Sequence, residues 1–201
     1  MNIQHNDDNI FDGQGFRYNV GIIILNAQNQ VFWGRRCGQD AWQFPQGGMQ
    51  GGESSEQAMF RELWEETGLY ASDVAVLGET RAWLRYRLPL RFRRRRRAGM
   101  VQCIGQKQKW FLLKLKREET IINLAAAGTP EFDQWRWLNY WQAVEEVVHF
   151  KRKVYQLALQ ELSEFVPELT ELRPISSMEN EYRYQCYYGN KAPSFAKRRR
   201  D

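Results

Sequence analysis

Residues 47–69, GGMQGGESSEQAMFRELWEETGL, join a glycine-rich loop to a segment with clustered glutamates. Gly47 is followed after five residues by Glu53, and after seven more by RELWEETGL, residues 61–69. Glycines let a backbone approach a ligand closely, and grouped carboxylates supply the oxygen ligands that hard divalent cations prefer. This stretch therefore indicates a metal and pyrophosphate site.

The second half of this stretch predicts a helix over about Ser55–Thr67. Ser54 followed three residues later by Gln57 forms a capping box, which satisfies backbone N–H groups at a helix start. Gly68 stands where a helix end needs a residue that tolerates left-handed backbone angles. Both ends of the helix are thus signalled.

One face of this helix is expected to carry carboxylates. At roughly 100° per residue, Glu62, Glu65 and Glu66 fall within an arc of about 100°, next to an apolar arc. Like charges at this spacing oppose a helix by a few tenths of a kcal/mol per pair, so a compensating cation is expected. Arg61 can neutralise part of the charge, and Mg²⁺ suits three carboxylates on one rigid helix. A solvated acidic face is the ordinary alternative, but the complete glycine, glutamate and arginine frame favours the site.

Composition limits the class of protein. The 201 residues are 43% hydrophobic and 14% aromatic, which predicts one domain with tails. Apolar runs such as 20–25 and 110–113 are far shorter than the roughly 20 residues that span a bilayer, and the polar N-terminus is no signal peptide. A cytoplasmic protein without membrane contact is expected. Three widely spaced cysteines, Cys37, Cys103 and Cys186, favour neither a disulfide framework nor a zinc site.

Strand-like and helical patterns lie on both sides of the predicted helix. Residues 18–26 and 31–35 form a β-branched, apolar pair around a polar turn, which predicts a hairpin. Further strands are expected at 73–78, 81–88, 107–116 and 131–139. A second helical segment is expected at 141–165, with a break near His149 and Phe150. This order predicts an α+β fold or an α/β/α sandwich.

Basic residues are concentrated in one internal loop and at the C-terminal end of the chain. We expect an N-terminal extension at 1–14, a domain at 15–166 and a flexible basic tail at 167–201, where apolar periodicity disappears. The net charge is +5, yet Arg93–Arg97 and Lys197–Arg200 concentrate cations. Such runs are often only solvated surface, but next to a pyrophosphate site they favour a polyanionic substrate.

The spacing of residues 47–69 resembles the signature of the Nudix hydrolases, with no position missing. Stretches outside it are similar to one subgroup, the bacterial RNA pyrophosphohydrolases, also described as dinucleoside polyphosphate hydrolases. These stretches are GFRYNVGIIILN, WGRRCGQDAWQFPQGG, TRAWLRYRLP, CIGQKQKWFLL, TPEFDQWRW and VVHFKRKVY. The resemblance covers about residues 15–160 and implies a Nudix-type α/β/α sandwich with a mixed β-sheet.

The resemblance also implies an activity. The enzyme would use Mg²⁺, with Mn²⁺ as a substitute, to convert 5′-triphosphate or diphosphate RNA ends to 5′-monophosphate by water attack. This reaction helps to start mRNA decay. Hydrolysis of diadenosine polyphosphates is the alternative activity, and dinucleoside polyphosphates are possible further substrates. A non-catalytic binding module is a third reading, but such a protein would be expected to have lost a signature glutamate, and none is lost here.

Site residues follow from the same resemblance. Metals would be held by Glu62, Glu65 and Glu66, by the Gly47 carbonyl, and by Glu131 from across the site. The three helix glutamates and Arg61 form the expected catalytic set, while Glu53, which would orient Arg61, and Gly68 support the motif. Which glutamate is the general base stays open, because metal coordination and base function use the same oxygens.

RNA recognition is expected at a second group of residues. The resemblance implies that Arg36 and Phe150 sandwich a base near the 5′ end, with Lys151 assisting. From the residues alone, Phe150 would be core and Arg36 surface. Our hypothesis is that Arg93, Arg94 and Arg95, in the basic loop, bind RNA downstream of the 5′ end.

Overall fold

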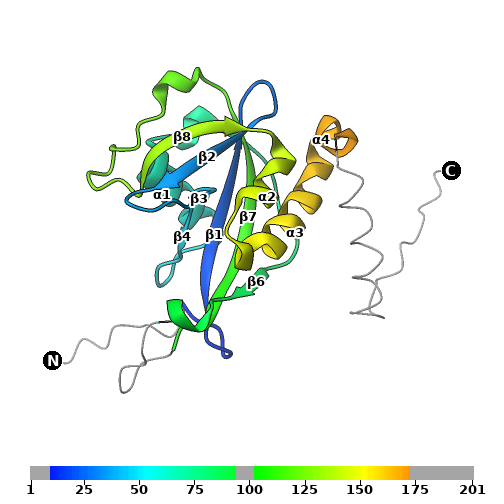
Figure 1. Ribbon diagram of the computed structural model, residues 1–201. Helices are drawn as coiled ribbons and strands as arrows, with labels where there is room; N and C mark the ends of the chain where they lie inside the picture. The colour runs from blue at the N-terminus through cyan, green and yellow to red at the C-terminus, as the bar shows by residue number, and fades with distance from the viewer. Residues whose placement is uncertain (1–9, 94–101, 173–201) are drawn as a thin grey trace.

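A computed structural model describes residues 10–93 and 102–172, in which one sheet lies between helices on its two faces (Figure 1). The expectations for residues 1–9, for Arg94 and Arg95, and for residues 173–201 lie outside the described parts of the chain.

Eight strands in these parts form a single mixed sheet. They are β1 (Phe16–Leu25), β2 (Val31–Arg36), β3 (Trp42–Gln43), β4 (Gln46–Gly48), β5 (Val74–Glu79), β6 (Leu84–Arg87), β7 (Gly105–Leu115) and β8 (Phe132–Leu138). The main path runs β3-β2-β1-β7-β5, with β4 paired to β1, β6 to β7 and β8 to β2. β1 and β7 are parallel, whereas the other pairs are antiparallel. The predicted hairpin of β1 and β2 is confirmed.

The α-helices are α1 (Ser55–Thr67), α2 (Ala143–Glu146), α3 (Arg152–Leu162) and α4 (Pro167–Glu171). Short 3-10 turns are η2 (Ala71–Asp73), η3 (Leu90–Phe92), η4 (Glu119–Ile121), η5 (Tyr140–Gln142), η6 (His149–Lys151) and η7 (Ser163–Phe165). The predicted break near His149 and Phe150 is confirmed as η6, between α2 and α3. Of the helices in the described residues, none has both the length and the apolar character needed to cross a membrane.

Buried apolar side chains form two clusters, one on each face of the sheet. Successive side chains of a strand point to opposite faces, so alternate residues of β1 enter different clusters. Ile23 and Leu25 join the cluster that contains the α3 residues Tyr155 and Leu159. Ile22 and Ile24 instead join the cluster of the α1 residues Met59 and Leu63. Residues 20–25 of β1 are buried on both faces of the sheet and form a continuous apolar run, as is usual for parallel pairs within a sheet.

The predicted boundaries of α1 are confirmed. The Ser54 side chain accepts a hydrogen bond from the Gln57 backbone N–H at 3.1 Å, and the Gln57 side chain accepts one from the Ser54 backbone at 2.9 Å. Gly68 has φ 72°, where an added Cβ would also meet the Asn123 carbonyl oxygen at 2.8 Å. The capping box and the left-handed glycine therefore fix both ends of the helix that carries the glutamates.

Two features differ from the sequence prediction. β3 and β4 were not expected, because two- and three-residue strands leave no periodic pattern; β4 exists through its pairing with β1, where Val20 faces Gly47. The packed chain also continues past the boundary expected at 166. In α4, Leu169 is buried and its carbonyl accepts a hydrogen bond from Trp141 Nε1 at 2.9 Å. Packed residues therefore extend into α4, and the domain boundaries stay a prediction.

Candidate active site

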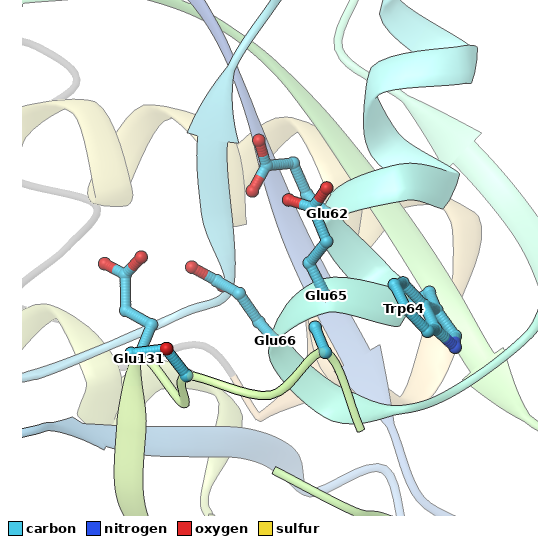
Figure 2. Close-up of a pocket in the computed structure, with 7 residues that line it drawn as sticks. Glu62, Trp64, Glu65, Glu66 and Glu131 are labelled. Atoms are coloured by element: carbon cyan, nitrogen blue, oxygen red, sulfur yellow. The ribbon is translucent and has the colours of Figure 1, made fainter. Parts of the chain in front are cut away.

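A cavity of about 320 Å³ lies between α1 and the segment that leads into β8. Its lining residues are Glu62, Trp64, Glu65, Glu66, Ala127, Thr129 and Glu131. Figure 2 shows the Glu131 side chain across the cavity from the three glutamates of α1. The structure thus brings together all four carboxylates that the sequence predicted, from elements about 70 residues apart.

Arg61 connects these carboxylates to the glycine-rich loop. Its Nη1 contacts Glu62 Oε1 at 2.6 Å and Glu65 Oε2 at 3.1 Å, while its Nη2 donates to the Gly48 carbonyl oxygen at 2.9 Å. The Glu53 carboxylate accepts hydrogen bonds from both Nε (2.8 Å) and Nη2 (2.9 Å) of Arg61. Such a bidentate pair fixes the plane of the guanidinium. This geometry agrees with the expectation that Glu53 orients Arg61 and the loop.

Glu66 is the most deeply buried of the four carboxylates. Its Oε2 accepts the Gln46 backbone N–H at 2.9 Å, but its Oε1 is buried without a hydrogen-bond partner. Burial, reinforced by the charge of Glu131, raises the pKa of Glu66 well above its ordinary value. Burial also raises the pKa of Glu62, although Arg61 opposes this shift. Both carboxyls therefore bind a proton more readily than exposed ones do, and a cation beside them would favour their charged forms.

Gly47 leaves space for the Glu62 carboxyl group directly above its Cα. A Cβ at this position would lie 1.8 Å from Glu62 Cδ and within 2.0 Å of both carboxylate oxygens. The pairing of β4 with β1 holds Gly47 in this place. Glycine is therefore required here for close approach of the backbone to a carboxylate.

The donor set fits a hard divalent cation. Carboxylate oxygens gathered at one cavity, one of them buried without a partner, are what Mg²⁺ and similar ions need. Within residues 10–93 and 102–172, however, no three carboxylate, imidazole or thiol groups already converge closely enough to hold a metal. Two of the cavity glutamates, Glu62 and Glu65, instead form ion pairs with Arg61. A cation would thus compete with the Arg61 guanidinium for these two side chains.

Of the two residues predicted to sandwich a base, the structure links one to this cavity. Arg36, at the end of β2, contacts Glu131 through Nη2 at 3.2 Å, and its Nε is buried without a partner. Phe150, in η6, is half-buried, and its ring centroid lies 5.9 Å from that of Tyr86. Arg36 is therefore linked directly to the cavity, while Phe150 belongs to an aromatic group next to β6.

Lys151 differs from the exposed lysine that an RNA contact suggests. It is 6% exposed, and its Nζ donates to Gln43 Oε1 at 2.8 Å. Burial lowers the pKa of Lys151 to about 7, and the charge of Arg36 adds to this effect. Any role of Lys151 in substrate binding thus depends on a proton that it holds weakly.

Lys151→Met is expected to remove a pH dependence of stability. Between about pH 7 and 10.5 the unfolded chain binds a proton at this lysine that the native chain does not, so wild-type stability rises with pH across this window and is lowest below it. The free energy of unfolding of the variant should exceed that of wild type by several kcal/mol at pH 6, up to about 5 kcal/mol, and by little at pH 10. Thermal unfolding from pH 6 to 10 measures this, with the exposed Lys116→Met as control. Parallel pH profiles for wild type and Lys151→Met would contradict it.

Several residues of the site carried no clear signal in the sequence. Gln43 accepts a hydrogen bond from Lys151 through its side chain, and Gln46 donates one to Glu66 through its backbone N–H. Isolated glutamines have no sequence pattern that marks such contacts. The exposed Arg17, on β1, lies over Gly48, since a Cβ there would meet Arg17 Nη2 at 2.3 Å. Its position next to the glycine-rich loop follows from the pairing of β1 with β4, which the sequence does not reveal.

Comparisons with known proteins agree with this arrangement. Residues 15–158 match the model of the NUDIX domain. The chain belongs to the Nudix family. An RNA pyrophosphohydrolase of Shewanella loihica is 58% identical over 154 residues, which are 77% of this chain and 87% of the relative. The Nudix resemblance expected from the sequence is therefore confirmed.

Solved structures support the Nudix fold. The E. coli dihydroneopterin triphosphate pyrophosphohydrolase aligns with a TM-score of 0.55 and 20% identity, covering 70% of this chain and 92% of that one. A C. elegans Ap4A hydrolase aligns with a TM-score of 0.54 and 18% identity, covering 75% and 98%. The predicted fold class, an α+β Nudix sandwich with a mixed sheet, is confirmed.

Proposed function

We propose that this Nudix protein is a cytoplasmic RNA 5′-pyrophosphohydrolase, which converts triphosphate or diphosphate RNA ends to monophosphate and so helps to start mRNA decay. The observation that carries the proposal is the cavity of four carboxylates, to which Arg36 is attached through Glu131. It combines a place for a metal-bound phosphate with a guanidinium at its rim. The relative from Shewanella loihica, named RNA pyrophosphohydrolase, supports the choice of substrate.

Glu62, Glu65, Glu66 and Glu131 would hold Mg²⁺, or Mn²⁺ in its place, with the Gly47 carbonyl as a further ligand. The bound cation would polarise the phosphoanhydride and lower the pKa of the attacking water. Arg61, which contacts Glu62 and Glu65, would share them with the cation, and Glu53 fixes Arg61 through its bidentate pair. The glutamate left outside the metal shell would accept the proton of the attacking water. Arg17, above Gly48, adds a cation for the phosphates.

Arg36 and Phe150 would bind a base of the RNA end. A guanidinium plane and an aromatic ring both stack on unpaired bases, and single-stranded RNA exposes these surfaces. The buried, unpartnered Nε of Arg36 favours an added acceptor. Lys151 would assist base binding indirectly, through its hydrogen bond to Gln43. Arg93 Nε donates a hydrogen bond to the Leu88 carbonyl oxygen at 2.8 Å. Contact of Arg93, Arg94 and Arg95 with downstream RNA stays a prediction.

The test compares two substrates with one enzyme preparation in Mg²⁺. A 5′-end-labelled triphosphate RNA and diadenosine tetraphosphate are supplied at equal concentration, to wild type and to Glu62→Gln. We expect faster conversion of the RNA to a monophosphate end, and no activity in the variant, because Glu62 is one of the expected metal ligands. Cleavage of the dinucleotide alone would keep the reaction class and reject the RNA assignment. Cleavage of neither substrate would reject the enzymatic proposal.

A further inference from the structure

Phe92 is a large aromatic side chain left in solvent next to the proposed RNA site. It lies at the end of η3 and is 51% exposed. Its ring centroid is 5.6 Å from that of Phe150, with the two planes inclined by 44°. The Arg91 guanidinium carbon lies 4.9 Å from the centroid of the Phe92 ring. An arginine and a phenylalanine are thus in contact here, the same combination of side chains that is proposed to bind a base at Arg36 and Phe150.

Hydrogen bonds hold this turn in place. The Phe92 backbone N–H donates to the Pro89 carbonyl oxygen at 2.9 Å, and that of Arg93 donates to the Leu90 carbonyl oxygen at 3.1 Å. The Arg93 side chain closes the turn from outside through its bond to the Leu88 carbonyl oxygen. Contact with Phe150 fixes the ring on its inner side. Phe92 is therefore presented by an ordered turn.

Three aromatic rings lie close together here. The ring centroid of Phe150 lies 5.9 Å from that of Tyr86 and 5.6 Å from that of Phe92. Two arginines, Arg91 and Arg93, flank Phe92 in the sequence, and the guanidinium of Arg91 lies over its ring. An apolar ring among cations matches a nucleobase with its phosphate better than it matches an apolar protein surface.

We propose that Phe92, with Arg91, forms a second stacking position, for the nucleobase next to the one held by Arg36 and Phe150. The inference rests on the proposed function, and it extends the substrate from an RNA end to at least one further unpaired nucleotide. Stacking on Phe92 uses the face of a base and so requires no particular sequence. Arg91 is exposed and can turn aside to receive the base or its phosphate. RNA with an unpaired 5′ segment is therefore preferred to the shortest substrates.

Three variants of the full chain separate stacking from packing. Phe92→Leu keeps an apolar contact for Phe150 but removes the aromatic face, whereas Phe92→Tyr retains that face. Leu90→Ala serves as the matched control, because Leu90 lies on the same turn and is 79% exposed. The substrates are 5′-triphosphate RNAs of two and of six nucleotides. The readouts are kcat and KM for each length.

Phe92→Leu is expected to raise KM for the longer RNA by about 5- to 10-fold, with the effect concentrated in KM and not in kcat. The preference for six nucleotides over two should then be lost, while Phe92→Tyr and Leu90→Ala retain it. A second measurement follows the fluorescence of 2-aminopurine placed at nucleotide two, three or four of the RNA. A metal chelator is present so that the bound RNA is not hydrolysed. Fluorescence should be quenched at one position in wild type through contact with Phe92, and this quenching should disappear in Phe92→Leu.

Each outcome distinguishes this inference from the proposed function. If wild type cleaves RNA but Phe92→Leu retains its length preference and its quenching, the second stacking position is wrong and the proposed function stands. If wild type cleaves no triphosphate RNA, the proposed function is wrong, and the quenching alone decides whether Phe92 binds a base. If Phe92→Leu changes only the sedimentation of the protein, the ring is a protein contact and the inference is overturned.

Discussion

Glu66→Gln is expected to lower the rate of RNA hydrolysis by about 10³-fold while leaving the fold intact, since loss of one charged metal ligand removes several kcal/mol of transition-state stabilisation. The amide oxygen of glutamine can still accept the Gln46 backbone N–H. The variant also lacks the buried carboxyl group of Glu66, whose pKa is raised by burial. Its thermal stability without metal should therefore equal or exceed that of wild type at pH 7.

The decisive measurement combines activity with metal-dependent stability. Wild type should melt at a higher temperature when Mg²⁺ is added, because a ligand of the native state shifts the unfolding equilibrium. Glu66→Gln should lose most of this increase. Glu56→Gln is the control, as Glu56 is an exposed glutamate in the first turn of the same helix. Near-normal turnover by Glu66→Gln would remove Glu66 from the metal site.

Gly47→Ala is expected to lower activity by about 10²-fold, which corresponds to roughly 2.7 kcal/mol in the barrier. The new methyl group would occupy the position of the Glu62 carboxyl, which would have to leave its place beside Arg61. Because the clash is with a side-chain end and not with backbone, the protein should still fold. The fault would then lie in the geometry of the site.

Matched substitutions test whether the Glu62 contact explains this loss. At Gly13 an added Cβ meets nothing within 4 Å, so Gly13→Ala should behave as wild type. At Gly48 it meets the end of the exposed Arg17, which can move, so Gly48→Ala should have a smaller effect than Gly47→Ala. Steady-state rates and melting temperatures of the three variants provide the comparison. Equal losses at Gly47 and Gly48 would point to a general effect on β4.

The sequence predicted α1 to the residue, because capping and the left-handed glycine are local signals. It also predicted β1, β2 and the break at η6 from periodicity. Neither kind of signal records which distant segments meet. The positions of Gln43, Gln46 and Arg17 depend on β4 and on tertiary contacts, which is why these residues were missed.

The three glutamates of α1 were predicted from their helical spacing and Glu131 from the family resemblance, and the structure adds the electrostatics. Nothing in the run of glutamates shows that Glu66 is buried or that Arg61 holds two of its neighbours. Likewise, Lys151 was expected to contact RNA at the surface, whereas it is buried and donates a hydrogen bond to Gln43. Burial of a charge is a property of the folded environment, and amphipathic patterns assign such residues to solvent by default.

The parallel pairing of β1 with β7 has a consequence for synthesis of the chain. Phe16 pairs with Gly105 and Leu25 with Lys114. The ribosome therefore adds about 90 residues after β1 before its parallel partner, β7, is made. The glycine-rich loop and α1 are made between them and leave the ribosome before the sheet that supports them exists. Until β7 has emerged, the apolar side of α1 lacks part of its packing surface. Nascent chains that stop before this point expose it to chaperones and proteases.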